Sequence, residues 1–76
     1  MIVKAYFTEN PKIMNYMPLP IIDKADVWLR KNITTTKDLE TGETMYMADE
    51  VYFRTSATKE TIENDFETWY EKGRGE

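Results

Sequence analysis

Two segments decide the fold of this chain, ADVWLRKNITT (residues 25–35) and MYMADEVYFRT (residues 45–55). Both are rich in β-branched and aromatic residues. In both, apolar and polar side chains alternate with the period of two that is typical of a half-buried strand. Between them, the sequence ETG (residues 40–42) provides a glycine for the left-handed position of a tight turn. The two segments are therefore predicted to pair as an antiparallel hairpin.

Charge predicts how the two strands are aligned. When opposed residue numbers add up to about 80, opposite charges face each other in three pairs, Asp26–Arg54, Arg30–Glu50 and Lys31–Asp49. The same alignment opposes three apolar pairs, Val27–Phe53, Leu29–Val51 and Ile33–Met47. A slip of one residue would lose all three charge pairs, whereas a slip of two would keep the faces. The faces are therefore more strongly specified than the register.

The chain before the hairpin predicts one strand and one long loop. Residues 2–7 alternate like a strand, with Val3, Ala5 and Phe7 on the face expected to join the core. Residues 9–23 contain three prolines, which forbid a regular helix. They are predicted to form a loop, although their many large apolar side chains are unusual for a simple solvated connection.

The chain after the hairpin predicts one helix over residues 59–72. Thr58 is the expected N-cap, because its hydroxyl can accept a hydrogen bond from an unpaired backbone amide. Gly73 is expected to end the helix, and residues 73–76 to form a frayed tail. The apolar stripe of the helix consists of Ile62, Phe66 and Trp69, at spacing i, i+4 and i+7.

Together these elements predict one α+β domain over residues 1–72. It comprises a three-stranded, mainly antiparallel β-sheet, built from a strand, a loop and the hairpin of residues 25–55, with one C-terminal α-helix packed on one face. One helix covers only one face. The other face has no second helix to cover it, so either the apolar loop of residues 13–22 folds back over it or it contacts another chain.

Both the uncovered face of the sheet and the apolar loop supply candidate residues for an interaction surface. Aromatic residues with arginine are the composition that protein interfaces favour, and methionine side chains adapt to irregular partners. The predicted surface comprises the sheet residues Trp28, Arg30, Tyr46 and Tyr52, and the loop residues Met14, Tyr16, Met17 and Leu19.

The 76 residues include no Cys and no His. The sequence therefore excludes a disulfide framework, a thiolate or imidazole metal site, and catalysis by these side chains. The neighbouring carboxylates Asp49 and Glu50 would point to opposite faces of a strand, so they cannot chelate one ion together. We expect no enzyme activity, no cofactor, no metal and no small-molecule substrate.

The net charge of −4 is unevenly distributed, with +3 on residues 1–37 and −7 on residues 38–76. The acidic half argues against direct binding to nucleic acid, which needs a basic patch. The sequence contains no apolar run of about 18 residues that would span a membrane and no signal peptide. We therefore expect a cytoplasmic protein with no membrane partner.

Two functions remain open. The first is a non-catalytic module that binds a partner protein or a second copy of itself. The second is an acidic inhibitor or regulator of a basic nucleic-acid-binding protein, whose helix would imitate a row of phosphates. An ordinary solvated helix face has the same composition. The acids concerned are Glu60, Glu63, Asp65, Glu67 and Glu71.

A resemblance supports the first function. The segments KADVWLRKNI (residues 24–33) and ADEVYFRT (residues 48–55), followed by a short helix with Phe66 and Trp69, resemble small uncharacterised proteins encoded in prophage regions of Firmicutes, often near tail genes. The resemblance covers residues 24–72 and brings no catalytic residues. It implies a phage structural or assembly accessory role, in the cytoplasm of a bacterial host or within a phage particle.

Overall fold

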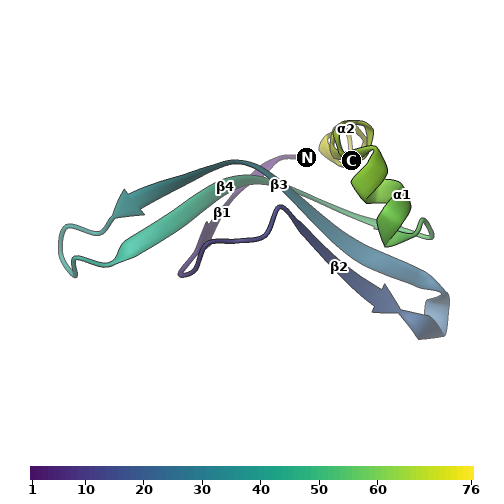
Figure 1. Ribbon diagram of the computed structural model, residues 1–76, viewed down its shortest axis with the longest axis horizontal. Coiled ribbons are helices and arrows are strands. Elements are labelled where there is room, and N and C mark those ends of the chain that lie inside the picture. Colours follow the sequence, from purple (N-terminus) through teal and green to yellow (C-terminus); the bar gives the residue numbers. More distant parts are fainter.

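The computed structural model describes residues 1–76 as one antiparallel sheet with two C-terminal helices (Figure 1). The elements are β1 (Val3–Phe7), β2 (Met14–Leu19), η1 (Pro20–Ile22), β3 (Lys24–Lys37), β4 (Thr44–Thr55), α1 (Lys59–Asn64) and α2 (Phe66–Arg74). The strand order in the sheet is β1-β4-β3-β2. The α+β class and the antiparallel sheet are as predicted, but the sheet has four strands and carries two helices, where three strands and one helix were expected.

The predicted register of the β3–β4 hairpin is confirmed up to Lys31. The structure pairs Asp26 with Arg54, Val27 with Phe53, Leu29 with Val51, Arg30 with Glu50 and Lys31 with Asp49. The turn also uses its glycine as predicted, since Gly42 has a φ of 75°. Cross-strand charge and apolar pairs therefore aligned the central strands correctly.

A β-bulge overturns the predicted pair Ile33–Met47. The register shifts between Lys31 and Thr34, so Met47 lies opposite Thr34. Asn32 has a φ of 54°, in the left-handed region that Asn tolerates better than most residues. A bulge bends its strand, and the sheet in Figure 1 is arched, with both helices on the outer side of the arch.

The second strand lies within residues 9–23, which were expected to be a loop. β2 runs antiparallel to β3 and places Pro18 opposite Ala25. Proline is tolerated at this position because β2 is an edge strand, so the missing N–H need not serve a further neighbour. The prolines correctly excluded a helix here, but they did not exclude an edge strand.

β1 is present as predicted, but it presents the opposite face. Val3 pairs with Glu50, Ala5 with Ala48 and Phe7 with Tyr46. These three side chains therefore share the face of Glu50, away from the helices, and do not join the core. The alternation of β1 was correct, and only its register against β4 decides which set of residues is buried.

The predicted helix is divided at Asp65, whose φ of −143° and ψ of 50° are not helical. Thr58 is the N-cap as predicted, because its hydroxyl accepts a hydrogen bond from the amide of Thr61. Gly73 does not end the helix: it is buried within α2, which continues to Arg74. The expected frayed tail is likewise replaced by contacts at the chain ends, where the amine of Met1 donates to the carbonyl oxygens of Gly73 and Glu76.

The core lies between the helices and the face of the sheet that they cover. Phe53 of β4 stacks on Trp69 of α2, with ring centres 5.6 Å apart. Burial of such apolar surface is the main stabilising contribution in a chain of this size. The buried residues of the core are Ala25, Val27, Leu29, Val51, Phe53, Ile62 and Tyr70, with Met14, Tyr16, Ala57, Phe66 and Trp69 packed around them.

Candidate interaction surface

The face of the sheet that points away from the helices, here called the open face, is the inner side of the arch in Figure 1. All four strands contribute alternate side chains to it, as their pairing requires. Its main residues are Val3 and Phe7 from β1, Met17 from β2, Asp26, Trp28 and Arg30 from β3, and Tyr46, Glu50, Tyr52 and Arg54 from β4.

A hydrogen-bonded cluster fixes one half of the open face. The buried carboxylate of Asp26 accepts hydrogen bonds from Nε of Arg54 at 2.8 Å and from the hydroxyl of Tyr52 at 2.6 Å. The bond from Arg54, followed by that from Tyr52, lowers the pKa of Asp26, and the bond to Asp26 raises the pKa of Tyr52. The ring of Tyr52 lies 5.3 Å from that of Trp28. These contacts hold both aromatic rings in defined positions.

Arg30 organises the other half. Its side chain is buried, and its Nε donates a hydrogen bond to Glu50 at 2.8 Å. Its Nη1 donates to the carbonyl oxygen of Lys12 at 3.1 Å, and its guanidinium lies 4.7 Å from the ring centre of Phe7. Arg30 therefore ties β1, β4 and the connection between β1 and β2 to the open face.

The predicted loop of residues 13–22 does not fold back over this face, because residues 14–22 form β2 and η1. β1 and β2 lie at opposite edges of the sheet, so the connection between them, residues 8–13, has to cross it. It passes over the open face beside Arg30 (Figure 1). Away from this connection the open face is uncovered, since Met17 is 47% exposed and Tyr52 44%.

The structure separates the eight predicted surface residues into two groups. The open face carries six of them, namely Trp28, Arg30, Tyr46, Tyr52, Met17 and Leu19. Met14 and Tyr16 lie opposite the core residues Leu29 and Val27, and both pack against the core. The hydroxyl of Tyr16 donates to the carbonyl oxygen of Ala57 at 2.9 Å. The period of two in β2 explains the division, and only the assignment of a strand could have predicted it.

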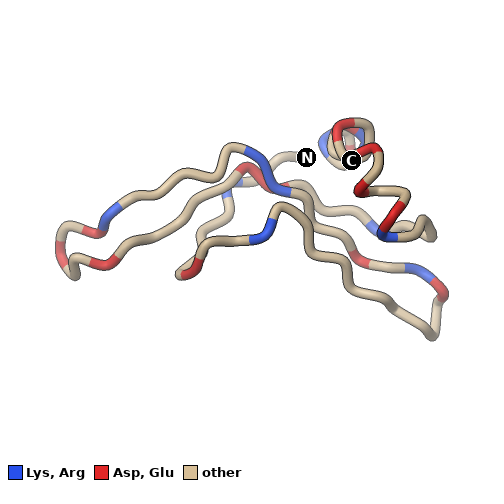
Figure 2. Tube along the Cα trace, in the orientation of Figure 1, with Lys and Arg blue, Asp and Glu red and all other residues tan.

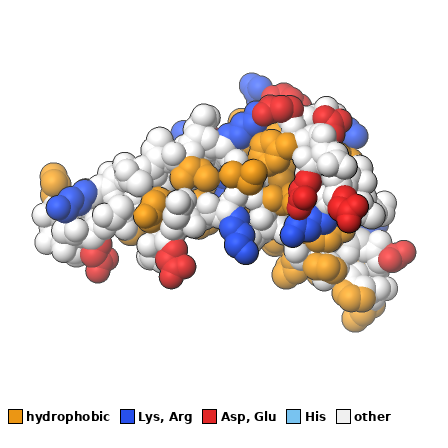
Figure 3. Space-filling view, in the orientation of Figure 1, with side chains coloured by type: hydrophobic (Ala, Val, Ile, Leu, Met, Phe, Trp, Pro, Cys, Tyr) orange, Lys and Arg blue, Asp and Glu red, His pale blue; other side chains and the backbone are white.

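The end of the molecule at η1 adds apolar residues that were not predicted as part of the surface. Ile21 is fully exposed and Ile22 is 48% exposed. Together with Leu19, Pro20 and Arg54 they line a shallow hollow beside the open face. Figure 3 shows apolar side chains gathered at this end of the molecule. The sequence contained a signal for this apolar end of the molecule, because two adjacent isoleucines directly follow Pro20, where the chain must turn.

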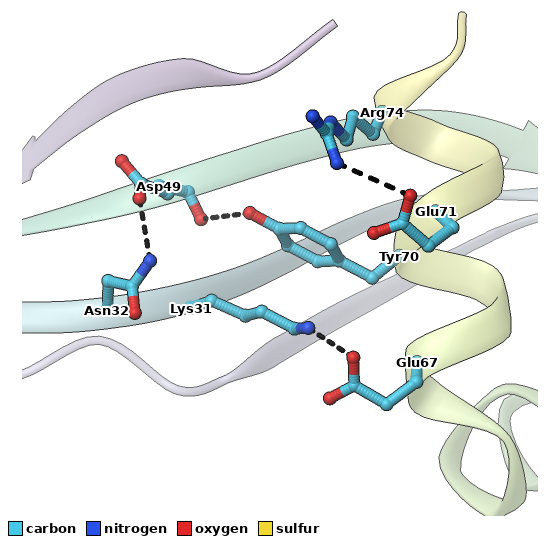
Figure 4. A network of polar contacts seen from close by, with 7 residues as sticks. All are labelled: Lys31, Asn32, Asp49, Glu67, Tyr70, Glu71 and Arg74. Carbon is cyan, nitrogen blue, oxygen red and sulfur yellow. Dashed lines mark hydrogen bonds and ion pairs between the residues drawn. The ribbon is translucent and has the colours of Figure 1, made fainter.

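The acidic helix residues lie on the opposite side of the molecule, and several are paired with bases. Glu67 accepts a hydrogen bond from Lys31, and Glu71 forms an ion pair with Arg74 at 3.5 Å (Figure 4). Glu63 faces Lys59 at 3.9 Å. The helices therefore do not present an uninterrupted row of free carboxylates.

The same region contains a polar contact network that joins β3, β4 and α2 (Figure 4). The carboxylate of Asp49 accepts hydrogen bonds from Lys4 and from the amide of Asn32, which lower its pKa in that order. The hydroxyl of Tyr70 donates to the carbonyl oxygen of Asp49 at 3.3 Å, and burial raises the pKa of Tyr70. These titratable groups are held by structural partners and do not converge on a cleft.

No group of three or more acidic side chains is arranged to hold a metal ion. None of the helices has the length and apolar character needed to cross a lipid bilayer. Comparisons with protein-family models, curated proteins and solved structures give no significant match.

Proposed function

We propose that this protein is a non-catalytic interaction module that contacts another protein, or a second copy of itself, through the open face. The resemblance of residues 24–72 to small prophage-encoded proteins supports the role of a structural or assembly accessory protein of a phage tail. The observation that carries the proposal is that both helices lie on one side of the sheet, while exposed aromatic and aliphatic side chains remain on the other.

The ordering of the open face supports this role. Trp28 and Tyr52 are held by ring contact and by the bond of Tyr52 to Asp26, so little side-chain entropy is lost when a partner covers them. The aromatic residues, methionine and arginines of the open face belong to the residue types that are enriched in protein interfaces. The pairing of Glu67 with Lys31 and of Glu71 with Arg74 gives the alternative role, as an acidic regulator, less support.

Photo-crosslinking tests the proposal for any protein that covers the open face. A benzophenone amino acid replaces Met17, which is half-exposed on the open face, in cells that express the gene in its native context. The matched control replaces Tyr6, which is 63% exposed and pairs with Met47 on the other face. We expect a discrete crosslinked protein from position 17 and none from position 6. Crosslinks from neither position, or equally from both, would contradict the proposal.

A further inference from the structure

The turn that joins β3 and β4 is an ordered acidic projection. The amide of Asp38 donates to the carbonyl oxygen of Glu43 at 2.8 Å, and the carboxylate of Asp38 accepts from the amide of Glu40 at 2.8 Å. Leu39, which lies between Asp38 and Glu40 in the sequence, is 96% exposed. The turn is therefore preorganised, and it presents one apolar side chain flanked by two negative charges.

This projection has no partner within its own chain. It lies at one end of the long axis of the molecule, and the helices lie on the other half (Figures 1 and 2). β1 pairs with β4 only as far as Tyr46, and β2 pairs with β3 only up to Leu29. Only the pairs Thr36–Met45 and Lys37–Thr44 and the turn itself extend beyond the three-stranded part of the sheet.

A hollow of complementary chemistry lies on the half that carries the helices. It has a volume of about 350 Å³ and is lined by Lys12, Ile13, Met14, Lys59, Glu63 and Phe66. Ile13 is 60% exposed at its rim, while Met14 and Phe66 form part of the wall of the core. The hollow therefore offers apolar contact beside two amines and one carboxylate, that of Glu63.

The two lysines are available to bind carboxylates. Lys12 forms no ion pair, and Lys59 has only a long, exposed contact with Glu63 at 3.9 Å. A second hollow, which continues past Met17 and Trp28 toward the open face, is bordered by the same two lysines. The second hollow is mainly polar, so the first, with Lys12 and Lys59 at its border, is the apolar site.

We propose that Leu39 of one copy inserts into this hollow of a second copy, with Asp38 and Glu40 placed against Lys12 and Lys59. The partner is another molecule of this chain, because the chain itself supplies both surfaces. Leu39 is an apolar side chain between two acids, and the hollow is apolar with two bases and one acid at its border. Charge complementarity of this kind fixes the orientation of the contact more than its strength.

The projection and the hollow are different surfaces, so the contact is heterologous. Each molecule can donate its projection to one neighbour and accept the projection of another, which produces a ring or a filament. One such contact is small compared with a stable dimer interface, so association should depend on both protein concentration and salt. The inference goes beyond the proposed function, because neither Leu39 nor the hollow beside Met14 and Phe66 belongs to the open face.

Sedimentation velocity over a concentration series tests the contribution of Leu39 to self-association. The wild type should increase in mass with concentration, and Leu39→Ser should weaken association roughly ten- to hundredfold, as expected for loss of one buried leucine. Leu39→Met, which keeps an apolar side chain of similar size, should restore most of it. Circular dichroism checks that each variant is folded, which we expect because Leu39 is exposed. A wild type that stays monomeric, or a Leu39→Ser variant that associates normally, would overturn the inference.

A charge exchange tests the pairing of the two surfaces. Glu40→Lys and Lys12→Glu should each weaken self-association, but an equimolar mixture of the two should associate again, since the basic projection of one meets the acidic hollow of the other. Glu76→Lys is the control for the same change of charge, and it should behave as the wild type. A mixture that does not recover would show that Glu40 and Lys12 do not meet. A purely monomeric protein would refute this contact and leave crosslinks from position 17 as the test of the proposed function.

Discussion

Gly73 of α2 lies directly on Val51 of β4. A Cβ atom on Gly73 would be 2.9 Å from Cγ2 of Val51 and 3.0 Å from Cδ1 of Phe53, closer than carbon atoms pack. The missing side chain therefore sets how near α2 can approach the sheet. Glycine normally destabilises the interior of a helix, but at this position it allows α2 to pack closely on β4.

Gly73→Ala is expected to destabilise the fold, although alanine is the better helix former. The methyl group must displace Val51 or shift α2, and overpacking of this kind costs about 1–3 kcal/mol. Urea unfolding monitored by circular dichroism would measure the loss. Gly75→Ala is the matched control, because its nearest atoms would be 3.7 Å away, so it should not destabilise the protein. Equal effects of the two substitutions would contradict the close contact.

Asn32 should be sensitive to the shape of its replacement, because its φ of 54° defines the bulge. Asn32→Gly keeps this conformation available and loses only the exposed hydrogen bond to Asp49, so we expect a change within about 0.5 kcal/mol. Asn32→Val forces a β-branched residue into the left-handed region, which costs about 1–3 kcal/mol. Urea unfolding of both variants measures the difference in their free energies of unfolding. A valine variant as stable as the glycine variant would show that the bulge is not strained by a side chain.

A substitution at Ile62 measures how much α1 contributes to the stability of the core. Its side chain is completely buried, so Ile62→Val should lower the free energy of unfolding by about 0.5–1.5 kcal/mol. Ile21→Val makes the same chemical change at a fully exposed position of η1, where the expected change is within about 0.5 kcal/mol. Thermal and urea unfolding should rank the two in this order, and the reverse order would place α1 away from the sheet.

Asp26 should make the stability depend on pH. Hydrogen bonds from Arg54 and Tyr52 hold the pKa of its carboxyl below the ordinary value of about 4. Because the folded pKa is the lower one, the carboxylate stabilises the fold above about pH 4, and this contribution is lost as the pH falls through the folded pKa. Asp26→Asn should therefore be less stable than the wild type at neutral pH, and the difference should shrink in acid. Unfolding by urea at a series of pH values measures it.

Asp49 provides the comparison for this experiment. Its pKa is also lowered, first by Lys4 and then by Asn32, so some acid sensitivity should remain in Asp26→Asn. If the stabilities of Asp26→Asn and the wild type differ by a constant amount down to the lowest pH at which both fold, the bonds from Arg54 and Tyr52 do not act on the ionisation of Asp26.

Much of the fold could be predicted from local patterns. The central hairpin aligned correctly because Asp26 with Arg54 and Arg30 with Glu50 gave independent signals for one register. Thr58 was recognisable as an N-cap because capping depends on residues only three positions apart. Four of the six candidate residues on the open face, Trp28, Arg30, Tyr46 and Tyr52, followed from the alternation of the strands, whereas Met17 and Leu19 were predicted as loop residues.

The errors occurred where the outcome depends on the neighbour that a segment meets. β2 was missed because proline is excluded from central strands but tolerated at an edge, and its sequence did not show which position it takes. The side chains of β1 were assigned to the wrong face because a strand with apolar residues on both faces can pair in either register. The bulge at Asn32 moved Met47 from Ile33 to Thr34, and one inserted residue changes every pair that follows.

The strand alternation, the central register, the turn at Gly42 and the cap at Thr58 could be predicted because each depends on short-range geometry or on matched pairs. The edge positions of β1 and β2, the packing of Gly73 against Val51 and the place of both helices on the same face emerge only in the folded chain. These features are set by contacts between residues distant in the chain, where many arrangements satisfy the same local pattern and only the packing of the whole core selects one.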